Sequence, residues 1–283
     1  QMKKKDLKYT KLASPAGIEK HNRLLLDKLH RELQGPFTVT EAGRTLGMET
    51  PRTGRLLAHW ASQGWLSRLR KGLYITVPLG TQSPAQWSED PWIVAHRLFE
   101  PCYIGGWSAC EHWGLTEQIF REIVVFTTRK VHNRRVTVKE TPFLLRVILP
   151  QKLFGATSVW RQQTKVRVSD PSRTVADLLN DPTIGGGIRF IAEIIGNYFG
   201  GERRNDAALL EAVSRMGNRT AYKRLGYLVE TLGINAPEVL RACRANLSKG
   251  YSLFDPTVKT KGHFVRRWNL LVNVAIGSET KQS

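Results

Sequence analysis

Residues 37–77 read FTVTEAGRTLGMETPRTGRLLAHWASQGWLSRLRKGLYITV, and this stretch decides the fold of the N-terminal region. We expect Thr40 to cap a first helix that ends near Leu46, because a threonine oxygen accepts the free backbone N–H groups at a helix start. Gly47 begins a turn, and Pro51 then opens a second helix, where a proline loses no helical hydrogen bond. The spacing predicts a helix-turn-helix.

The second helix of this stretch has two different faces. Leu56, Leu57 and Trp60 gather on one side and predict a packed face. Polar side chains that can reach a polyanion gather on the other side, and they are Arg52, Arg55 and His59. Arginines near the start of a recognition helix can bond guanine bidentately. For Thr53 two interpretations are open, contact with a phosphate or thymine methyl and plain helix surface.

A basic hairpin follows the second helix. Apolar residues alternate over 73–77 after a predicted turn at 70–72, so residues 65–77 are expected to form a two-stranded wing. The wing carries the cations Arg68, Arg70 and Lys71. Contacts from such a wing to phosphates or the minor groove position a domain on DNA more than they select its sequence. The whole stretch therefore predicts a winged helix that binds double-stranded DNA.

The composition agrees with a polyanionic partner. The chain of 283 residues has 43 Lys and Arg against 24 Asp and Glu, a formal net charge of +19. Residues 1–80 hold 15 of these cations and 6 of the acids, which gives +9, so positive charge is densest at the N-terminal end. No run of eighteen apolar residues occurs, and we expect a cytoplasmic protein that does not enter a membrane.

Prolines and glycines mark the ends of the predicted elements and so divide the chain into segments. The spacing of Leu26, Leu29 and Leu33 predicts a helix over 18–33 that supplies the third helix of a winged-helix core. The fold class is α+β, with an N-terminal winged helix-turn-helix and a larger mixed domain whose C-terminal half is helical. The expected segments are a basic flexible arm at 1–17, a DNA-binding domain at 18–78, a linker at 79–90 and an α+β domain at 91–283.

Beyond residue 90 the spacing of apolar residues is typical of helices in some segments and of strands in others. Helices are predicted at 91–99 and 107–114, and strands at 102–104, 122–128, 135–140, 143–149 and 164–168. Five further helices are expected at 172–179, 188–198, 206–216, 221–232 and 237–246. The last predicted strands lie within 251–254 and 263–273.

Four sequence blocks follow the winged helix in a fixed order. They are YIGGWSACEHWGL at 103–115, VSDPSRTVADLL at 168–179, RLGYLVETLG at 224–233, and LFDP with RRWNLLVN within 253–273. Together with the winged helix, these blocks resemble the AbiEi antitoxins of type IV toxin–antitoxin systems. The resemblance implies a winged helix that represses its own operon, through inverted repeats in the promoter. It also implies a C-terminal antitoxin domain that neutralises a cognate nucleotidyltransferase toxin, by direct binding or by opposing its action.

Candidate residues for the antitoxin domain lie in the blocks or, for Lys223, directly before one, and each has a structural alternative. Ser108 follows two glycines and either caps a helix or helps to cradle a phosphate. Arg173 and Asp177 lie one helical turn apart and either pair with each other or contact a partner. Lys223 and Arg224 lie beside an apolar stripe and face a partner or water.

Signatures of catalysis are missing from the sequence. After Gly106 there is no Asp-x-Asp that would hold the metals of a nucleotidyltransferase, and no G-x-S-x-G, P-loop or G-x-G-x-x-G occurs. Cys102, Cys110 and His112 do not have a metal-ligand spacing. We therefore expect no enzyme activity, no metal and no cofactor.

Two other classes of protein stay open. One is a stand-alone winged-helix transcriptional regulator whose C-terminal part binds a ligand or dimerises. The other is a metal-dependent nuclease whose carboxylates meet only in the fold, with Glu122, Asp170 and Glu193 as donors.

Overall fold

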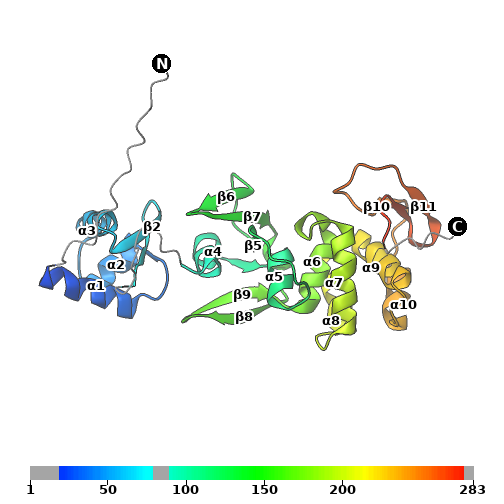
Figure 1. Cartoon of the computed structure of the whole chain (residues 1–283), viewed down its shortest axis with the longest axis horizontal. Coiled ribbons are helices and arrows are strands. Elements are labelled where there is room, and N and C mark those ends of the chain that lie inside the picture. Colours follow the sequence, from blue (N-terminus) through cyan, green and yellow to red (C-terminus); the bar gives the residue numbers. More distant parts are fainter. Residues whose placement is uncertain (1–18, 79–88, 277–283) are drawn as a thin grey trace, which may run out of the picture. The chain divides into compact units, whose positions relative to one another are not determined.

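The computed structural model describes residues 19–78 and 89–276, and the fold is mixed α+β as the sequence predicted (Figure 1). The described residues form two compact units that divide after Val94, and residues 162–164 belong to the N-terminal one. The predicted arm at 1–17 and residues 79–88 of the predicted linker lie outside the described residues.

The N-terminal unit contains a winged helix. Its elements are α1 (Lys20–Glu32), β1 (Phe37–Thr38), α2 (Val39–Leu46), α3 (Thr50–Ser62), β2 (Leu66–Arg70) and β3 (Leu73–Thr76). Strands β2 and β3 form the predicted antiparallel hairpin, and β1 adds to it in the order β1-β3-β2. Strand β1 was not predicted because two residues are too short for a periodic pattern.

Helix α2 starts earlier than the sequence suggested, so the prediction of Thr40 as its cap is wrong. Thr38 is the N-cap, and its hydroxyl accepts the Glu41 backbone N–H at 3.2 Å. The Glu41 carboxylate in turn accepts the Thr38 backbone N–H at 2.7 Å. This reciprocal pair is a capping box, which satisfies two backbone donors and outweighs the single bond that Thr40 would offer. Gly47 ends α2 with φ of +67°, a backbone conformation that favours glycine.

The core of the winged helix lies between α1, α3 and the hairpin. Leu57 and Trp60 of α3 are fully buried, as their spacing predicted. They pack in one cluster with Leu26 and Leu29 of α1 and with Tyr74 of β3. Because this side of α3 packs in the core, the opposite side of the helix faces outward.

A six-stranded mixed sheet forms the centre of the second unit, in the order β6-β7-β5-β4-β9-β8. From residue 91 onward the chain forms α4 (Pro91–Phe99), β4 (Cys102–Ile104), α5 (Gly106–His112), β5 (Ile123–Thr127), β6 (Arg135–Val138), β7 (Thr141–Val147), β8 (Ala156–Arg161) and β9 (Thr164–Ser169). Of these elements, residues 91–94 of α4 and residue 164 of β9 are counted with the N-terminal unit. Strand β8 was missed by the sequence prediction. Its side chains are exposed or half-buried, so they lack the alternation that marks a strand with one buried face.

Helices follow the sheet in the chain. They are α6 (Pro171–Asn180), α7 (Ile188–Gly200), α8 (Asp206–Met216), α9 (Arg219–Thr231) and α10 (Pro237–Ala245). Helix α6 contacts α5, α7, α8 and α9 (Figure 1). Because neighbours surround it, eight consecutive residues of α6, from 172 to 179, are buried.

A small sheet closes the described chain, with strands β10 (Ser252–Leu253), β11 (His263–Val265) and β12 (Leu270–Val272) in the order β10-β12-β11. Trp268, in the turn before β12, anchors this sheet to α9. Its ring occupies the space beside Gly226, where an added Cβ would lie 2.1 Å from the ring atom Cζ3. The indole N–H donates to the Glu230 carboxylate. Glycine is therefore required at position 226 by close approach.

Candidate nucleic-acid interface

The outward side of α3 carries Arg52, Arg55 and His59, and all three are exposed. Helix α3 begins with Thr50 and Pro51 in its first turn, so both arginines lie in the N-terminal half of the helix. Within residues 19–78 and 89–276, neither arginine makes an ion pair. Two guanidinium groups free of carboxylates are thus available to an anionic partner.

The wing adds a second group of exposed cations, Arg68, Arg70 and Lys71. Gly72 turns the chain between β2 and β3 with φ of +77°. The strand register shifts between Arg68 and Arg70, an irregularity that changes the direction of neighbouring side chains. As in α3, the structure leaves these cations in solvent.

Thr53 does not belong to this surface. Its side chain is 0% exposed, and its hydroxyl donates to the Glu49 carbonyl at 2.9 Å. The Thr53 Oγ1 atom would also lie 3.3 Å from a Cβ added at Gly43, so α2 and α3 meet closely there. Contact with DNA through Thr53 is excluded by this burial, and its role is to hold the helix-turn-helix together.

Arg44 is a further exposed cation beside the helix-turn-helix, and it was not predicted. It lies in the last turn of α2 and is followed by the left-handed Gly47. In a helix-turn-helix the first helix crosses the DNA backbone, so a cation near the turn can contact phosphate. The signal in the sequence was an arginine one turn before the glycine that breaks the helix.

The candidate residues of the second unit are all buried, starting with Ser108. Its hydroxyl accepts the Val124 backbone N–H at 3.1 Å and so joins α5 to β5. Gly105 is the N-cap of α5, and no side chain caps that helix. Both sequence interpretations of Ser108, a helix cap and a phosphate cradle, are therefore wrong. Gly106 has no room for a phosphate, because an added Cβ would lie 2.8 Å from the Ile184 carbonyl oxygen.

Arg173 and Asp177 pair with each other inside the protein. The Arg173 Nε atom donates to Asp177 Oδ1 at 2.9 Å, and both side chains are at most 2% exposed. Tyr103 of β4 closes the network, since its hydroxyl donates to Asp177 at 3.0 Å and accepts from Arg173 at 2.8 Å. The guanidinium also lies 4.0 Å from the centroid of the Phe154 ring. A partner cannot reach this pair, which joins α6 to the central sheet.

Helix α6 begins with a side-chain cap. Asp170 accepts the Arg173 backbone N–H at 2.8 Å, and Pro171 occupies the first turn. Burial raises the pKa of Asp177 to about 6, against the lowering effect of the Arg173 charge. Removing these two charges from water costs free energy, and this cost offsets part of the electrostatic attraction between them.

Lys223 and Arg224 of α9 also point inward. Lys223 donates to the Gly250 carbonyl at 2.7 Å and to the Ser252 hydroxyl at 3.1 Å. Arg224 donates to the backbone carbonyls of Phe254, Leu253 and Leu179. Burial lowers the pKa of the Arg224 guanidinium to about 10. Neither residue faces a partner or water, and both attach the strand β10 segment to α9.

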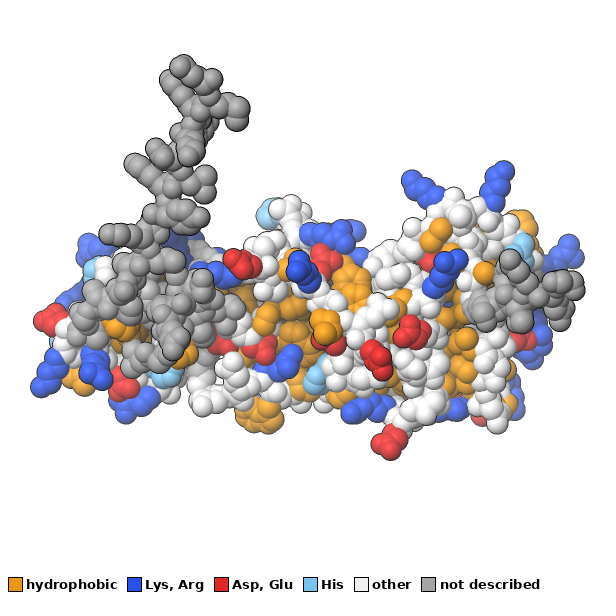
Figure 2. Space-filling model, in the orientation of Figure 1, with side chains coloured by type: hydrophobic (Ala, Val, Ile, Leu, Met, Phe, Trp, Pro, Cys, Tyr) orange, Lys and Arg blue, Asp and Glu red, His pale blue; other side chains and the backbone are white. Residues whose placement is uncertain are grey.

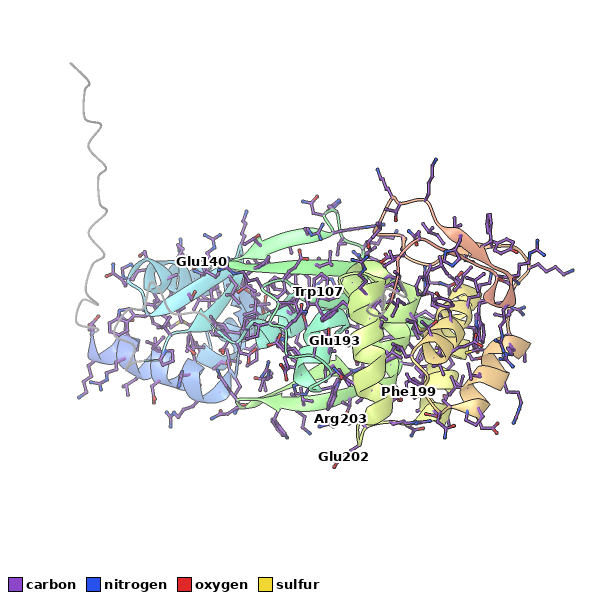
Figure 3. The ribbon with its side chains drawn as sticks, turned by 45° about the vertical axis from the view of Figure 1, so that its right-hand side comes forward. Trp107, Glu140, Glu193, Phe199, Glu202 and Arg203 are labelled. Atoms are coloured by element: carbon purple, nitrogen blue, oxygen red, sulfur yellow. The ribbon has the colours of Figure 1, made fainter. Side chains whose placement is uncertain are left out.

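The carboxylates proposed for a nuclease are in separate places. Glu122 pairs with Arg135 at 2.8 Å, and Asp170 caps α6. Glu193 is exposed on α7 (Figure 3). Among the residues that the structure describes, no three His, Cys, Asp or Glu side chains come together as metal ligands. Over the same residues, no helix has the length and apolarity needed to cross a membrane.

The fold is similar to that of a known crystal structure. The RV2827C protein from Mycobacterium tuberculosis matches with a TM-score of 0.62 and 15% sequence identity, over 90% of this chain and 92% of that chain. At this identity the likeness concerns the fold alone. No curated protein matches the sequence.

The winged helix itself has a family match, which spans residues 25–77 and includes α3 and the wing. The matching family model is described as "Transcriptional regulator, AbiEi antitoxin", and the sequence resemblance indicated the same family. The region of this chain that forms the winged helix thus matches the transcriptional regulators of the AbiEi antitoxin family.

Proposed function

We propose that this protein is a DNA-binding antitoxin, without enzyme activity of its own, that represses its toxin–antitoxin operon from the cytoplasm. One observation carries the DNA-binding half of the proposal. Exposed cations occupy both α3 and the wing, in the unit that matches a family of transcriptional regulators. They are Arg52, Arg55, Arg68, Arg70 and Lys71.

In this proposal α3 enters the major groove and the wing contacts the flanking backbone. Arg52 and Arg55 are then the residues that contact base edges, since they lie in the first half of α3. Arg68, Arg70 and Lys71 neutralise phosphates, which makes affinity fall with rising salt. His59 lies nearer the end of α3 and contributes to the same surface.

Binding to the protein's own promoter tests this assignment. Replacing Arg52 and Arg55 with alanine should cost roughly 1–3 kcal/mol of specific binding each, measured by fluorescence anisotropy against specific and scrambled duplexes. Arg241→Ala is the matched control, because it removes one exposed charge that pairs with Glu238 in the other unit. Undiminished discrimination between the two duplexes in the double variant would refute the role of α3.

The wing gives an independent measurement. Lys71→Ala should weaken binding to both duplexes equally and reduce the slope of log affinity against log salt by about one. A change in sequence preference instead would mean that the wing contacts bases.

We further propose that the second unit neutralises a cognate nucleotidyltransferase toxin, directly or by opposing its action. The support is the set of sequence blocks at 103–115, 168–179, 224–233 and 253–273. Residues of these blocks are buried in the second unit, as Arg173 and Arg224 illustrate. Residues that contact the toxin must therefore lie on the exposed surface of the second unit.

The two activities can be separated in the full chain. Toxin and antitoxin are expressed from unrelated promoters, with Arg52→Ala and Arg55→Ala in the antitoxin. Growth rescue by this variant is expected, because repression of the operon plays no part in that arrangement. Loss of rescue despite normal protein levels would favour a stand-alone regulator, which protects only through repression.

A further inference from the structure

The outer face of the C-terminal sheet carries exposed aromatic and apolar side chains. Tyr251 is 48% exposed, Leu253 38% and Phe264 63%. The strand register places Leu271 of β12 directly between Leu253 of β10 and Phe264 of β11. Directly opposed residues point to the same side of a sheet, so these side chains form one surface. We call Tyr251, Leu253, Phe264 and Leu271 the C-terminal platform.

The two aromatic rings of the platform are neighbours. The ring centroids of Tyr251 and Phe264 lie 4.6 Å apart, with an angle of 62° between the ring planes. Each ring is in edge contact with the other, so the pair does not bury itself by face-to-face stacking. Large exposed rings cost free energy in water unless a partner covers them.

The charge around the platform is positive. Residues 246–276 contain five Lys and Arg against one acidic residue, Asp255, and Asp255 is buried. Of the cations only Arg267 forms an ion pair among the described residues, with Glu230 of α9. Figure 1 draws this C-terminal part of the chain in orange and red. Figure 2 shows Lys and Arg side chains that project from it. All five cations of the set are exposed, namely Lys249, Lys259, Lys261, Arg266 and Arg267, and His263 is exposed as well.

We propose that the C-terminal platform binds single-stranded nucleic acid, with bases stacked on Tyr251 and Phe264 and with phosphates on the surrounding cations. Exposed aromatic rings beside cations are the combination by which proteins hold unpaired bases and their backbone. A duplex fits less well, because its bases are stacked on each other and cannot reach the rings. An acidic protein would match the charge, and the ring substitutions described below distinguish it from a nucleic acid.

The site is distinct from the winged helix, because the platform and α3 belong to different compact units. Its test therefore uses full-length protein that already carries Arg52→Ala and Arg55→Ala. The probes are fluorescein-labelled oligouridylate, oligothymidylate of equal length, and a mixed-sequence duplex, measured by anisotropy. We expect at least one of the single strands to bind more tightly than the duplex. Comparison of the affinities for oligouridylate and oligothymidylate then shows whether the platform prefers RNA or DNA.

Substitutions on the platform then locate the binding. Tyr251→Ala with Phe264→Ala should weaken single-strand binding at least about tenfold, because each stacked base depends on one ring. Phe264→Leu keeps an apolar side chain on the outer face and removes the ring, so it should also weaken binding. Ile119→Ala is the control, since Ile119 is 84% exposed and lies outside the platform. Thermal unfolding verifies that each variant is folded.

Three results would overturn the proposal. They are no binding of either single strand, equal binding of the duplex, and an affinity that the ring substitutions leave unchanged. If the ring substitutions abolish capture of the toxin and leave oligonucleotide affinity unchanged, the platform is a protein-docking surface and the proposal is also wrong. Because operator binding is measured separately with intact α3, failure here leaves the assignment of the winged helix in place, and the reverse also holds.

Discussion

The exposed cations of the winged helix and the buried cations of the second unit are the same residue types in opposite surroundings. Arg52 and Arg55 meet solvent, whereas Arg224 donates to four backbone carbonyls and Arg173 pairs with a buried carboxylate. The partners of a cation therefore decide whether it binds a ligand or holds the fold. The comparison predicts stability losses for the buried set and binding losses for the exposed set.

The largest effect is expected from breaking the buried ion pair. Asp177→Ala leaves the Arg173 charge without its carboxylate and should lower the free energy of unfolding by about 3–5 kcal/mol. Chemical denaturation monitored by circular dichroism measures the loss. Arg173→Met together with Asp177→Leu is the control, since removal of both charges should restore much of the stability. If the double variant is as unstable as the single one, charge is not the cause.

The next effect concerns the attachment of the C-terminal sheet to α9. Gly226→Ala introduces a Cβ where the Trp268 ring lies and should destabilise the protein by about 1–3 kcal/mol. Hydrogen exchange should show the loss of protection in residues 263–272. Gly196→Ala in α7 is the control, because nothing lies within 4 Å of its added Cβ. That control should be neutral or stabilising by about 0.5–1 kcal/mol.

Within α3, substitutions at Thr53 and Arg52 should separate a loss of stability from a loss of DNA binding. Thr53→Ala removes a buried hydrogen bond and should cost about 1 kcal/mol of stability without changing sequence discrimination on DNA. Arg52→Ala should do the opposite, with loss of specific binding and unchanged unfolding. Both quantities are measured on both variants, by anisotropy and by denaturation. A specificity change in Thr53→Ala that exceeds its stability change would reverse the assignment.

The smallest effect is expected for an exposed ion pair. Arg241 lies 2.6 Å from Glu238 on the surface of α10, and Arg241→Ala should change the unfolding free energy by less than about 1 kcal/mol. Measured beside Asp177→Ala, this variant sets the scale of the contrast between buried and exposed charges. Similar losses in the two variants would remove the basis of the comparison.

Local patterns were sufficient to predict most elements of the fold. Strand β4 and helix α8 occupy the predicted residues, because glycine, proline and asparagine mark their ends and apolar residues repeat at the right period. The winged helix was predictable for the same reason, including the turn at Gly72. Thr38 was predictable as the cap as well, because Thr38 and Glu41 have the spacing of a capping box.

The candidate site was predictable only in part. The exposed positions of Arg52 and Arg55 follow from one amphipathic helix, since the apolar face of α3 fixes where the other face points. The burial of Arg173 does not follow from its helix, because α6 is covered by several helices that are distant in sequence. An i,i+4 arginine–aspartate pair is the same pattern on a surface and in a core. Only tertiary packing distinguishes the two cases.

The order of strands in the C-terminal sheet has a consequence for synthesis of the chain. Strand β12 follows β10 and β11 in the sequence, yet it lies between them and pairs with both. During translation β10 and β11 therefore leave the ribosome without their partner strand, and the sheet completes only after residue 272 has emerged. A nascent chain that already contains the whole winged helix thus still lacks the platform. Folding of the chain should proceed in that order, with the α3 surface complete first.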